Sequence, residues 1–168
     1  MNVENKMAFE PKGLGGWLIL PALGLIITPF RMVSQITRDL LPLLNAETWG
    51  ALTTQGTNAY HPLWAPLISF EVITNIAMFG STIWLLILFF KKSKRVPNLF
   101  VAWFLLLATV QVIDHLLANQ IPLVASQNDP KSMKELSRSV IAAAIWVPYF
   151  LKSKRVKNTF IEESPSST

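Results

Sequence analysis

The sequence has no cysteine and little charge. Without a cysteine among its 168 residues, the chain can form neither disulfides nor thiolate-ligated metal clusters, and it has no thiol nucleophile. Charged residues make up only 15% of the chain, against about 25% in a typical soluble domain. The scarcity of charge leaves long apolar runs, which are typical of a membrane protein rather than of a soluble core.

Motifs for catalysis and cofactor binding are missing as well. The run from Gly13 to Gly16 is not a dinucleotide-binding loop, because no strand precedes it and the third glycine is misplaced. The sequence contains no P-loop, no H-E-x-x-H and no G-x-S-x-G. Its two histidines, His61 and His115, are far apart and lack the spacing of metal ligands. We therefore expect a non-enzymatic protein without a metal or cofactor.

Four segments are apolar enough, or nearly so, to form membrane-spanning helices of about 20 residues. The predicted spans are 14–30, 66–90, 98–118 and 134–151. The last has a short apolar stretch, Val140 to Leu151, and reaches spanning length only with Ser132 as N-cap and charged residues in its outer turns. The prediction is an all-α fold: a four-helix transmembrane bundle in one domain over residues 1–161, followed by a disordered tail at 162–168. The acidic and basic residues before the first run do not suit a cleavable signal peptide.

Lysine and arginine predict the orientation of these spans. Ten basic residues lie before the first span, between the second and third spans, and after the fourth, whereas five lie on the other side, in the first connection, before the fourth span or in its outer turns. The side richer in lysine and arginine normally faces the cytoplasm. We therefore expect both termini in the cytoplasm, beneath a bacterial inner membrane, which requires an even number of spans. The net charge of +5 then indicates contact with anionic lipid headgroups rather than with nucleic acid.

The first outer connection carries an apolar pattern of its own. Apolar residues recur between Met32 and Leu44 on roughly one helical face, with Arg38 and Asp39 off that face. This pattern predicts an amphipathic outer-surface helix in the first extracytoplasmic loop. The following segment, 45–62, contains Gly50, Gly56 and Pro62 and is predicted to be a loop.

Residues 92–100 recur as residues 152–160, with seven of nine positions identical. Both copies follow an apolar segment, so they are consistent with basic stop signals on the cytoplasmic side. A parallel duplication of helix pairs is a second interpretation, and a pair of equivalent basic hooks for lipid or a cytoplasmic partner is a third. The candidate contacts of such hooks are Lys92, Lys94, Arg95, Lys152, Lys154, Arg155 and Phe160.

Polar and ionisable residues inside spans are costly and are candidates for function. Counted at about 1.5 Å per residue, such residues gather at one depth near the extracytoplasmic boundary. The predicted polar layer consists of Arg31, Glu71, Asn75, Gln111, Asp114, His115 and Arg138. Two interpretations follow. The layer is a structural clasp, in which Glu71 and Asp114 pair with the two arginines, or it is a ligand or ion site that opens outward.

Three stretches also match a known family. They are Gly13-Leu-Gly-Gly-Trp-Leu, Tyr60-His-Pro-Leu-Trp with the following Phe70-Glu71 and Asn75, and the closing run Tyr149 to Phe160. Through them the chain resembles, over nearly its whole length, the bacterial inner-membrane family known as domain of unknown function 2569. The closing Ser-x-Arg-Val-x-x-Thr-Phe element is the most specific of the three. The resemblance implies a four-helix inner-membrane protein and implies no activity or catalytic residue.

Two functional hypotheses follow from these patterns. The first is a non-enzymatic accessory or interaction protein that works through membrane partners or lipid, because the basic hooks and the outer helix offer contact surfaces. The second is a carrier or sensor of a small molecule or ion, with its site in the polar layer. A polar layer that is dry and internally paired would favour the first, and a solvent-connected pocket there would favour the second.

Overall fold

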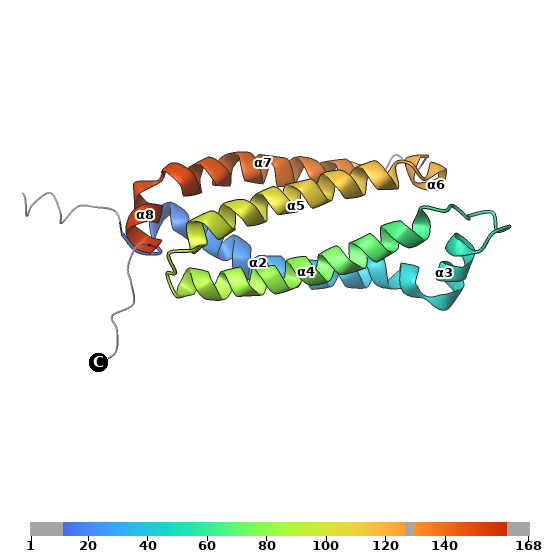
Figure 1. The fold of residues 1–168 in the computed structure, drawn as a ribbon, viewed down its shortest axis with the longest axis horizontal. Coiled ribbons are helices and arrows are strands. Elements are labelled where there is room, and N and C mark those ends of the chain that lie inside the picture. Colours follow the sequence, from blue (N-terminus) through green and yellow to red (C-terminus); the bar gives the residue numbers. More distant parts are fainter. Residues whose placement is uncertain (1–11, 127–129, 161–168) are drawn as a thin grey trace, which may run out of the picture.

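The computed structural model describes residues 12–126 and 130–160, and in this part of the chain the secondary structure is entirely helical. Figure 1 shows the long helices running side by side along the molecule. They are α2 (Ile19–Gln35), α4 (Trp64–Phe90), α5 (Val96–Ala118) and α7 (Pro130–Lys152). The short helices α3 (Ala46–Thr53) and α6 (Pro122–Ala125) lie at one end, and α8 (Lys154–Phe160) lies at the other. The predicted tail at 162–168 lies outside the described residues.

Three helices of the described chain are long and apolar enough to cross a membrane: Gly16–Leu44, Trp64–Phe90 and Val96–Ala118. The second and third agree with the predicted spans to within two residues. The predicted fourth span, 134–151, lies inside α7, but α7 is not among the three. Its first half carries Lys134, Glu135 and Arg138, and these charges lower its mean hydropathy.

The first helix is longer than predicted. A single turn of 3-10 helix (η1, Gly16–Leu18) leads into α2, which continues as a π-helical segment (η2, Ile36–Leu40) and a 3-10 segment (η3, Leu41–Leu44). The prediction of a span that ends at residue 30, followed by a separate surface helix, is therefore wrong. No glycine or proline occurs between residues 31 and 41, so nothing stops the helix there.

A short helix does occur in this connection, further along the chain. It is α3, which begins after Asn45, whose side-chain oxygen accepts a hydrogen bond from the backbone N–H of Glu47 at 3.2 Å. This is the usual capping role of asparagine at a helix start. The segment predicted to be a loop, 45–62, therefore contains a helix in its first half.

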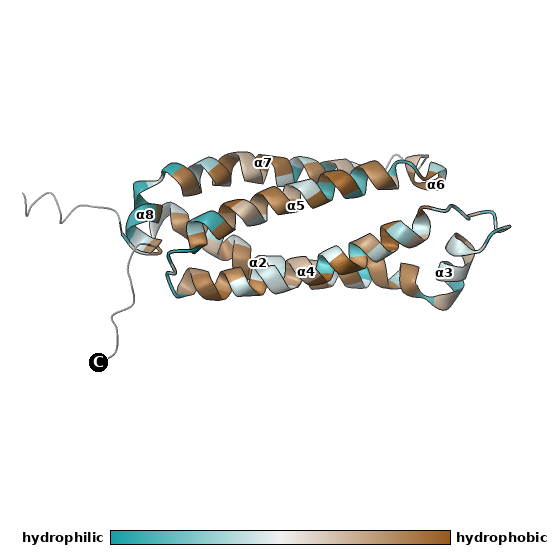
Figure 2. Ribbon diagram, viewed as in Figure 1, coloured by the Kyte–Doolittle hydropathy of each residue, from teal (hydrophilic) through white to brown (hydrophobic). Residues whose placement is uncertain are grey.

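The long helices pack in the order α2–α4–α5–α7. Helix α4 lies between α2 and α5, and α5 makes its most extensive contact with α7. The outer members of this series, α2 and α7, share little direct contact. Hydrophobic residues cover much of the length of these helices, and hydrophilic residues gather near their ends (Figure 2).

An aromatic core fills the α8 end of the molecule. The side chains of Phe89, Phe100, Phe150 and Phe160 are each at most 2% exposed. The rings of Phe100 and Phe150 stack in parallel with centroids 4.0 Å apart, and Phe89 contacts Phe160 at 5.3 Å. Such pairs add roughly 0.5–1.5 kcal/mol each to the free energy of burial.

The two terminal segments of the described chain are joined at the same end. The backbone N–H of Gly13 donates to Oγ1 of Thr159 at 2.9 Å, and Thr159 Oγ1 donates to the Gly13 carbonyl at 3.2 Å. The guanidinium of Arg155 lies over Gly15 and Gly16, where a Cβ atom at Gly16 would be 3.1 Å from Cζ of Arg155. Gly16 also has φ of +59°, so both contact and backbone conformation favour glycine there.

The repeated segment has a structural explanation. In each copy the serine lies at a helix start and accepts a backbone N–H at 3.4 Å: Ser93 before α5 and Ser153 before α8. The valine and the phenylalanine that follow, Val96 and Phe100 or Val156 and Phe160, are at most 1% exposed. The capping by serine and the burial of valine and phenylalanine explain why these residues recur at the same positions in both copies. The duplication hypothesis remains a prediction.

The residues of the predicted basic hooks differ in how far they are buried. Phe160 is 1% exposed, so its predicted role as a surface contact is wrong, and Arg155 is half-buried against the glycines. The other five candidates, Lys92, Lys94, Arg95, Lys152 and Lys154, are exposed. The α8 end therefore presents a basic surface made by these five residues.

A second hydrophobic cluster closes the α3 end. It contains Leu40, Leu52, Trp64, Leu67, Ile68 and Ile121, each at most 8% exposed. The indole N–H of Trp64 donates to the carbonyl of Ala59 at 3.1 Å. The molecule thus has one packed cluster toward each end, and the predicted polar layer lies between them.

Candidate functional site

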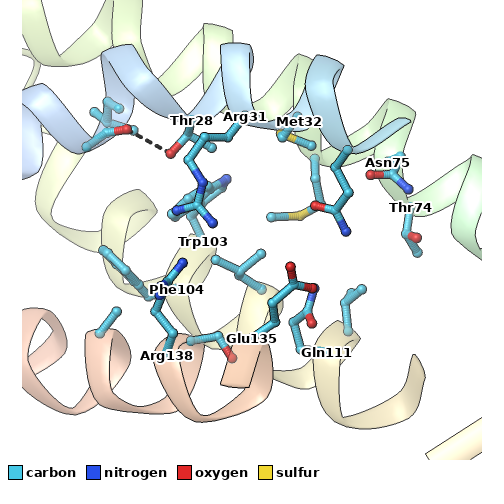
Figure 3. Close-up of a pocket in the computed structure, with 18 of the residues that line it drawn as sticks. Thr28, Arg31, Met32, Thr74, Asn75, Trp103, Phe104, Gln111, Glu135 and Arg138 are labelled. Atoms are coloured by element: carbon cyan, nitrogen blue, oxygen red, sulfur yellow. Dashed lines mark hydrogen bonds between the residues drawn. The ribbon is translucent and has the colours of Figure 1, made fainter. Parts of the chain in front are cut away.

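A cavity of about 490 Å³ lies between the two hydrophobic clusters and is lined by all four long helices. Figure 3 shows side chains reaching into it from α2 on one wall and from α7 on the opposite wall. Its volume falls within the range of about 300–1,000 Å³ that small-molecule sites usually have.

The structure places six of the seven predicted polar-layer residues in the lining of this cavity. They are Arg31, Glu71, Asn75, Gln111, Asp114 and Arg138. The seventh, His115, is not in the lining, and its Nε2 lies 3.0 Å from the side-chain nitrogen of Asn119. The helical spacing therefore brought together residues that are distant in the sequence.

The structure adds polar residues that the prediction did not include: Gln35, Asp39, Trp103, Glu135 and Ser139. Asp39 was assigned to a surface helix because the first span was predicted to end too early. Glu135 belongs to the outer turns of the predicted fourth span and was not included in the polar layer. The available signal was spacing on α7, since Glu135, Arg138, Ala142 and Trp146 recur at intervals of three or four residues and so share one helical face.

The predicted ion pairs are not formed. Neither Arg31 nor Arg138 makes an ion pair with Glu71 or Asp114. The charged groups that act on the two acids are instead each other and the nearby Asp39, His115 and Glu135. The clasp, as we predicted it from the sequence, is therefore wrong.

The two arginines face each other across the cavity. Arg31 comes from α2 and Arg138 from α7, and both reach into the space beside Trp103 and Phe104 (Figure 3). Both side chains are exposed. The indole nitrogen of Trp103, whose side chain is 8% exposed, is buried without a hydrogen-bond partner. This region therefore offers hydrogen-bond donors and positive charge.

The acidic residues form a different part of the wall. The carboxyl groups of Glu71 on α4 and Asp114 on α5 interact directly, and this contact leaves the buried Oδ1 of Asp114 without a hydrogen-bond partner. Two ionised carboxylates in contact repel each other, so a cationic group or a proton near them is stabilising. This region therefore offers acceptors and negative charge.

Polarity changes in the same direction along each of three helices. On α2 the lining runs from Leu20 and Leu25 to Arg31 and Gln35. On α5 it runs from Phe100 and Phe104 to Gln111 and Asp114, and on α7 the residues nearest α8 are Ala142 and Trp146. The cavity is therefore amphipathic, with an apolar part toward α8 and a charged part toward α3.

The chemistry of the described residues gives no sign of a metal centre. No three of the histidine, aspartate and glutamate side chains within 12–126 and 130–160 are arranged so that they could hold a metal ion. The polar groups that do converge, guanidinium, carboxyl, amide and indole, are those that bind the charged groups of organic molecules.

Together, the apolar helices and the amphipathic cavity between them define a helical membrane protein with an internal cavity. Residues 11–161 match the family described as a protein of unknown function (DUF2569), and the chain belongs to this family. The Inner membrane protein YdgK of Escherichia coli (strain K12) is 32% identical to it over 151 residues, which are 90% of this chain and 95% of that protein. No solved structure matches the chain.

Proposed function

We propose that this protein is a non-enzymatic protein of the bacterial inner membrane that binds a lipid-like amphiphile with an anionic headgroup. The observation that carries the proposal is the position of Arg31 and Arg138. Within residues 12–126 and 130–160 neither arginine pairs with an acid, and the two face each other where the apolar part of the cavity meets its charged part.

Electrostatics explains why an anion suits this position. A guanidinium that lies exposed within the membrane layer is costly unless a partner compensates its charge. Phosphate and carboxylate groups match the planar guanidinium and accept two hydrogen bonds from it. Two such side chains on opposite walls, with the indole N–H of Trp103 nearby, would hold one anionic group between them.

The shape of the cavity supports an amphiphile over a compact solute. The lining toward α8 consists of apolar side chains such as Leu25, Phe104 and Trp146, which would bury a hydrocarbon chain. Because α2 and α7 share little direct contact, a molecule from the lipid phase could enter between them. The anionic headgroup would then rest between the arginines.

The same arrangement supports α7 as the fourth span. The charged residues in its first half, Glu135 and Arg138, line the cavity, so they would face a headgroup rather than hydrocarbon. Four spans place both termini on one side. The exposed basic surface at the α8 end favours the cytoplasm for that side, where it would contact anionic lipid headgroups.

Single cysteines test this topology, because the natural chain has none. Gln55 and Lys154 are exposed at opposite ends of the molecule. We expect Gln55→Cys to react with a membrane-impermeant maleimide in intact spheroplasts and Lys154→Cys to react only after the membrane is opened. The reverse pattern, or equal labelling of both in intact spheroplasts, would contradict the proposed topology.

Ligand binding is tested with a pair of short-chain probes that differ in charge. Dihexanoyl phosphatidic acid and dihexanoylglycerol would be titrated into the detergent-solubilised protein, with tryptophan fluorescence as the readout, because Trp103 and Trp146 line the cavity. We expect saturable binding of the phosphatidic acid and much weaker binding of the uncharged probe. A charged hydrogen bond contributes about 1.5–3 kcal/mol, so Arg31→Gln or Arg138→Gln should raise the Kd about tenfold or more.

Arg38→Gln is the matched control, since Arg38 is exposed, lies on the continuation of the same helix and does not line the cavity. It should leave the Kd unchanged. Equal binding of the charged and uncharged probes, or equal effects of Arg31→Gln and Arg38→Gln, would overturn the proposal.

A further inference from the structure

Each of the four helical columns that line the cavity contributes one acidic residue to its wall. These are Asp39 from the continuation of α2, Glu71 from α4, Asp114 from α5 and Glu135 from α7. The proposed anion site does not use them, because an anionic headgroup beside carboxylates is repelled. A ring of acids next to a pair of arginines therefore favours a ligand that carries a positive charge as well as a negative one.

The acids lie on the α3 side of the arginines. Along α7, Glu135 precedes Arg138 by three residues, a rise of about 4.5 Å toward the α3 end. In the first helical column, Asp39 follows Arg31 by eight residues, which is again toward the α3 end. The order from α8 to α3 is therefore apolar, basic and acidic on both opposite walls.

The two buried polar atoms without partners follow the same order along α5. Trp103 offers an unsatisfied N–H donor, and Asp114, eleven residues closer to the α3 end, offers an unsatisfied oxygen acceptor. Trp103 is more than nine-tenths buried. Buried polar groups are nearly always satisfied in folded proteins, so a donor and an acceptor left open in one cavity indicate a ligand that supplies both an acceptor and a donor.

We infer that the headgroup is zwitterionic, with an anionic group between Arg31 and Arg138 and an ammonium group among Glu71, Asp114 and Glu135. This inference rests on the proposed function, because it assigns a second charged group to the same ligand. The separation of about 4.5 Å between the Glu135 and Arg138 levels on α7 suits a short aminoalkyl phosphate. That chemistry occurs in the headgroup of phosphatidylethanolamine and in free phosphoethanolamine.

The experiment compares two short-chain lipids with the same acyl chains and the same phosphate. Dihexanoyl phosphatidylethanolamine carries the ammonium group, and dihexanoyl phosphatidylglycerol lacks it. We expect the wild-type protein to bind the ethanolamine lipid about tenfold more tightly. Glu135→Gln and Asp114→Asn should weaken binding of the ethanolamine lipid and leave binding of the glycerol lipid unchanged or tighter.

Glu47→Gln is the matched control, because Glu47 lies on α3 away from the lining, and it should change neither Kd. If an acidic variant fails to fold, the comparison of the two lipids on the wild-type protein still decides. Equal Kd values for both lipids, with both dependent on Arg31 and Arg138, would overturn the zwitterion and leave the proposed function standing. Loss of the arginine dependence for both lipids would overturn the proposed function itself.

Free phosphoethanolamine is the third arm and distinguishes the two sources of the headgroup. Weak binding, at least tenfold poorer than that of the ethanolamine lipid, supports a membrane lipid. If the free compound binds as tightly as the lipid while the dependence on Glu135 persists, the zwitterion stands and the chain-binding part of the proposed function is overturned.

Discussion

The aromatic core at the α8 end and the cavity both draw on the four long helices, and α8 adds to the core alone, yet the two regions differ in almost every physical respect. At the α8 end, four phenylalanines are almost fully buried, and Phe100 stacks on Phe150. Around the cavity, two arginines and four acids line open space, and two buried polar atoms lack partners. Stability is concentrated in the first region, which leaves the second free to keep groups that packing alone would not favour.

The hydrogen bonds of polar side chains also differ between the α8 end and the cavity. At the α8 end, Thr159 exchanges hydrogen bonds with the backbone of Gly13, 146 positions away in the sequence. In the cavity, the side chains of Asn75 and Thr74 donate to backbone carbonyls of their own helix. The first pattern joins two distant segments of the chain, and the second keeps the hydrogen bonds of Asn75 and Thr74 within one helix.

The largest effect on stability should come from the aromatic core. Phe100→Ala removes a buried ring that contacts Phe89, Phe104 and Phe150, and such changes cost about 3–5 kcal/mol. Phe90→Ala is the control, because Phe90 is 52% exposed. Denaturant unfolding in detergent would measure both. Similar losses for the two variants would break the contrast between the two regions.

A smaller effect is expected where the terminal segments join. Gly16→Ala places a Cβ against Arg155 at a residue with φ of +59°, and the left-handed conformation costs other residues about 1–2 kcal/mol. Gly80 is helical and has open space around its Cα, so Gly80→Ala should stabilise the helix by up to about 1 kcal/mol. Thermal unfolding in detergent should therefore shift in opposite directions for the two variants, and shifts of the same sign would contradict the assignment.

The smallest effect on stability should come from the cavity. Arg138 makes no ion pair with another described residue, so Arg138→Met should change the free energy of unfolding by no more than about 0.5 kcal/mol. The same variant should weaken binding of dihexanoyl phosphatidic acid about tenfold or more. A loss of stability above about 2 kcal/mol would instead indicate that the arginine holds the helices together, as a clasp would.

Much of the helical layout could be predicted from the sequence. The spans beginning near Trp64 and Val96 were predicted to within two residues because their apolar runs are long and the basic cluster at 91–95 separates them. The end of the first helix could not be predicted in this way. The apolar run stops at Arg31, and the sequence alone does not distinguish this stop from a membrane boundary. A helix can continue past that boundary when a cavity accommodates its polar side chains, as it does for Arg31 and Asp39.

Depth and helical face were enough to predict which polar residues would meet, but not how they would pair. Glu71, Asp114, Arg31 and Arg138 all line one cavity, and they were predicted at one depth because rise per residue fixes depth. Equal numbers of acids and arginines then suggested ion pairs. Pairing depends on the distance between helices, and α2 and α7 share little direct contact and face each other across the cavity. The repeated serine, valine and phenylalanine were likewise visible in the sequence, but their burial in the core was not.

The central claim is that the cavity is open and attracts anions through Arg31 and Arg138, and one measurement tests it without knowledge of the ligand. Ser139→Cys places a thiol in the cavity lining, next to Arg138, in a chain without other cysteines. Its rates of modification by a sulfonate-bearing and an ammonium-bearing methanethiosulfonate would be compared with and without Arg31→Gln and Arg138→Gln. The account predicts that the ratio of anionic to cationic rates falls about tenfold when both arginines are replaced. An unchanged ratio, or a thiol that neither reagent reaches, would contradict it.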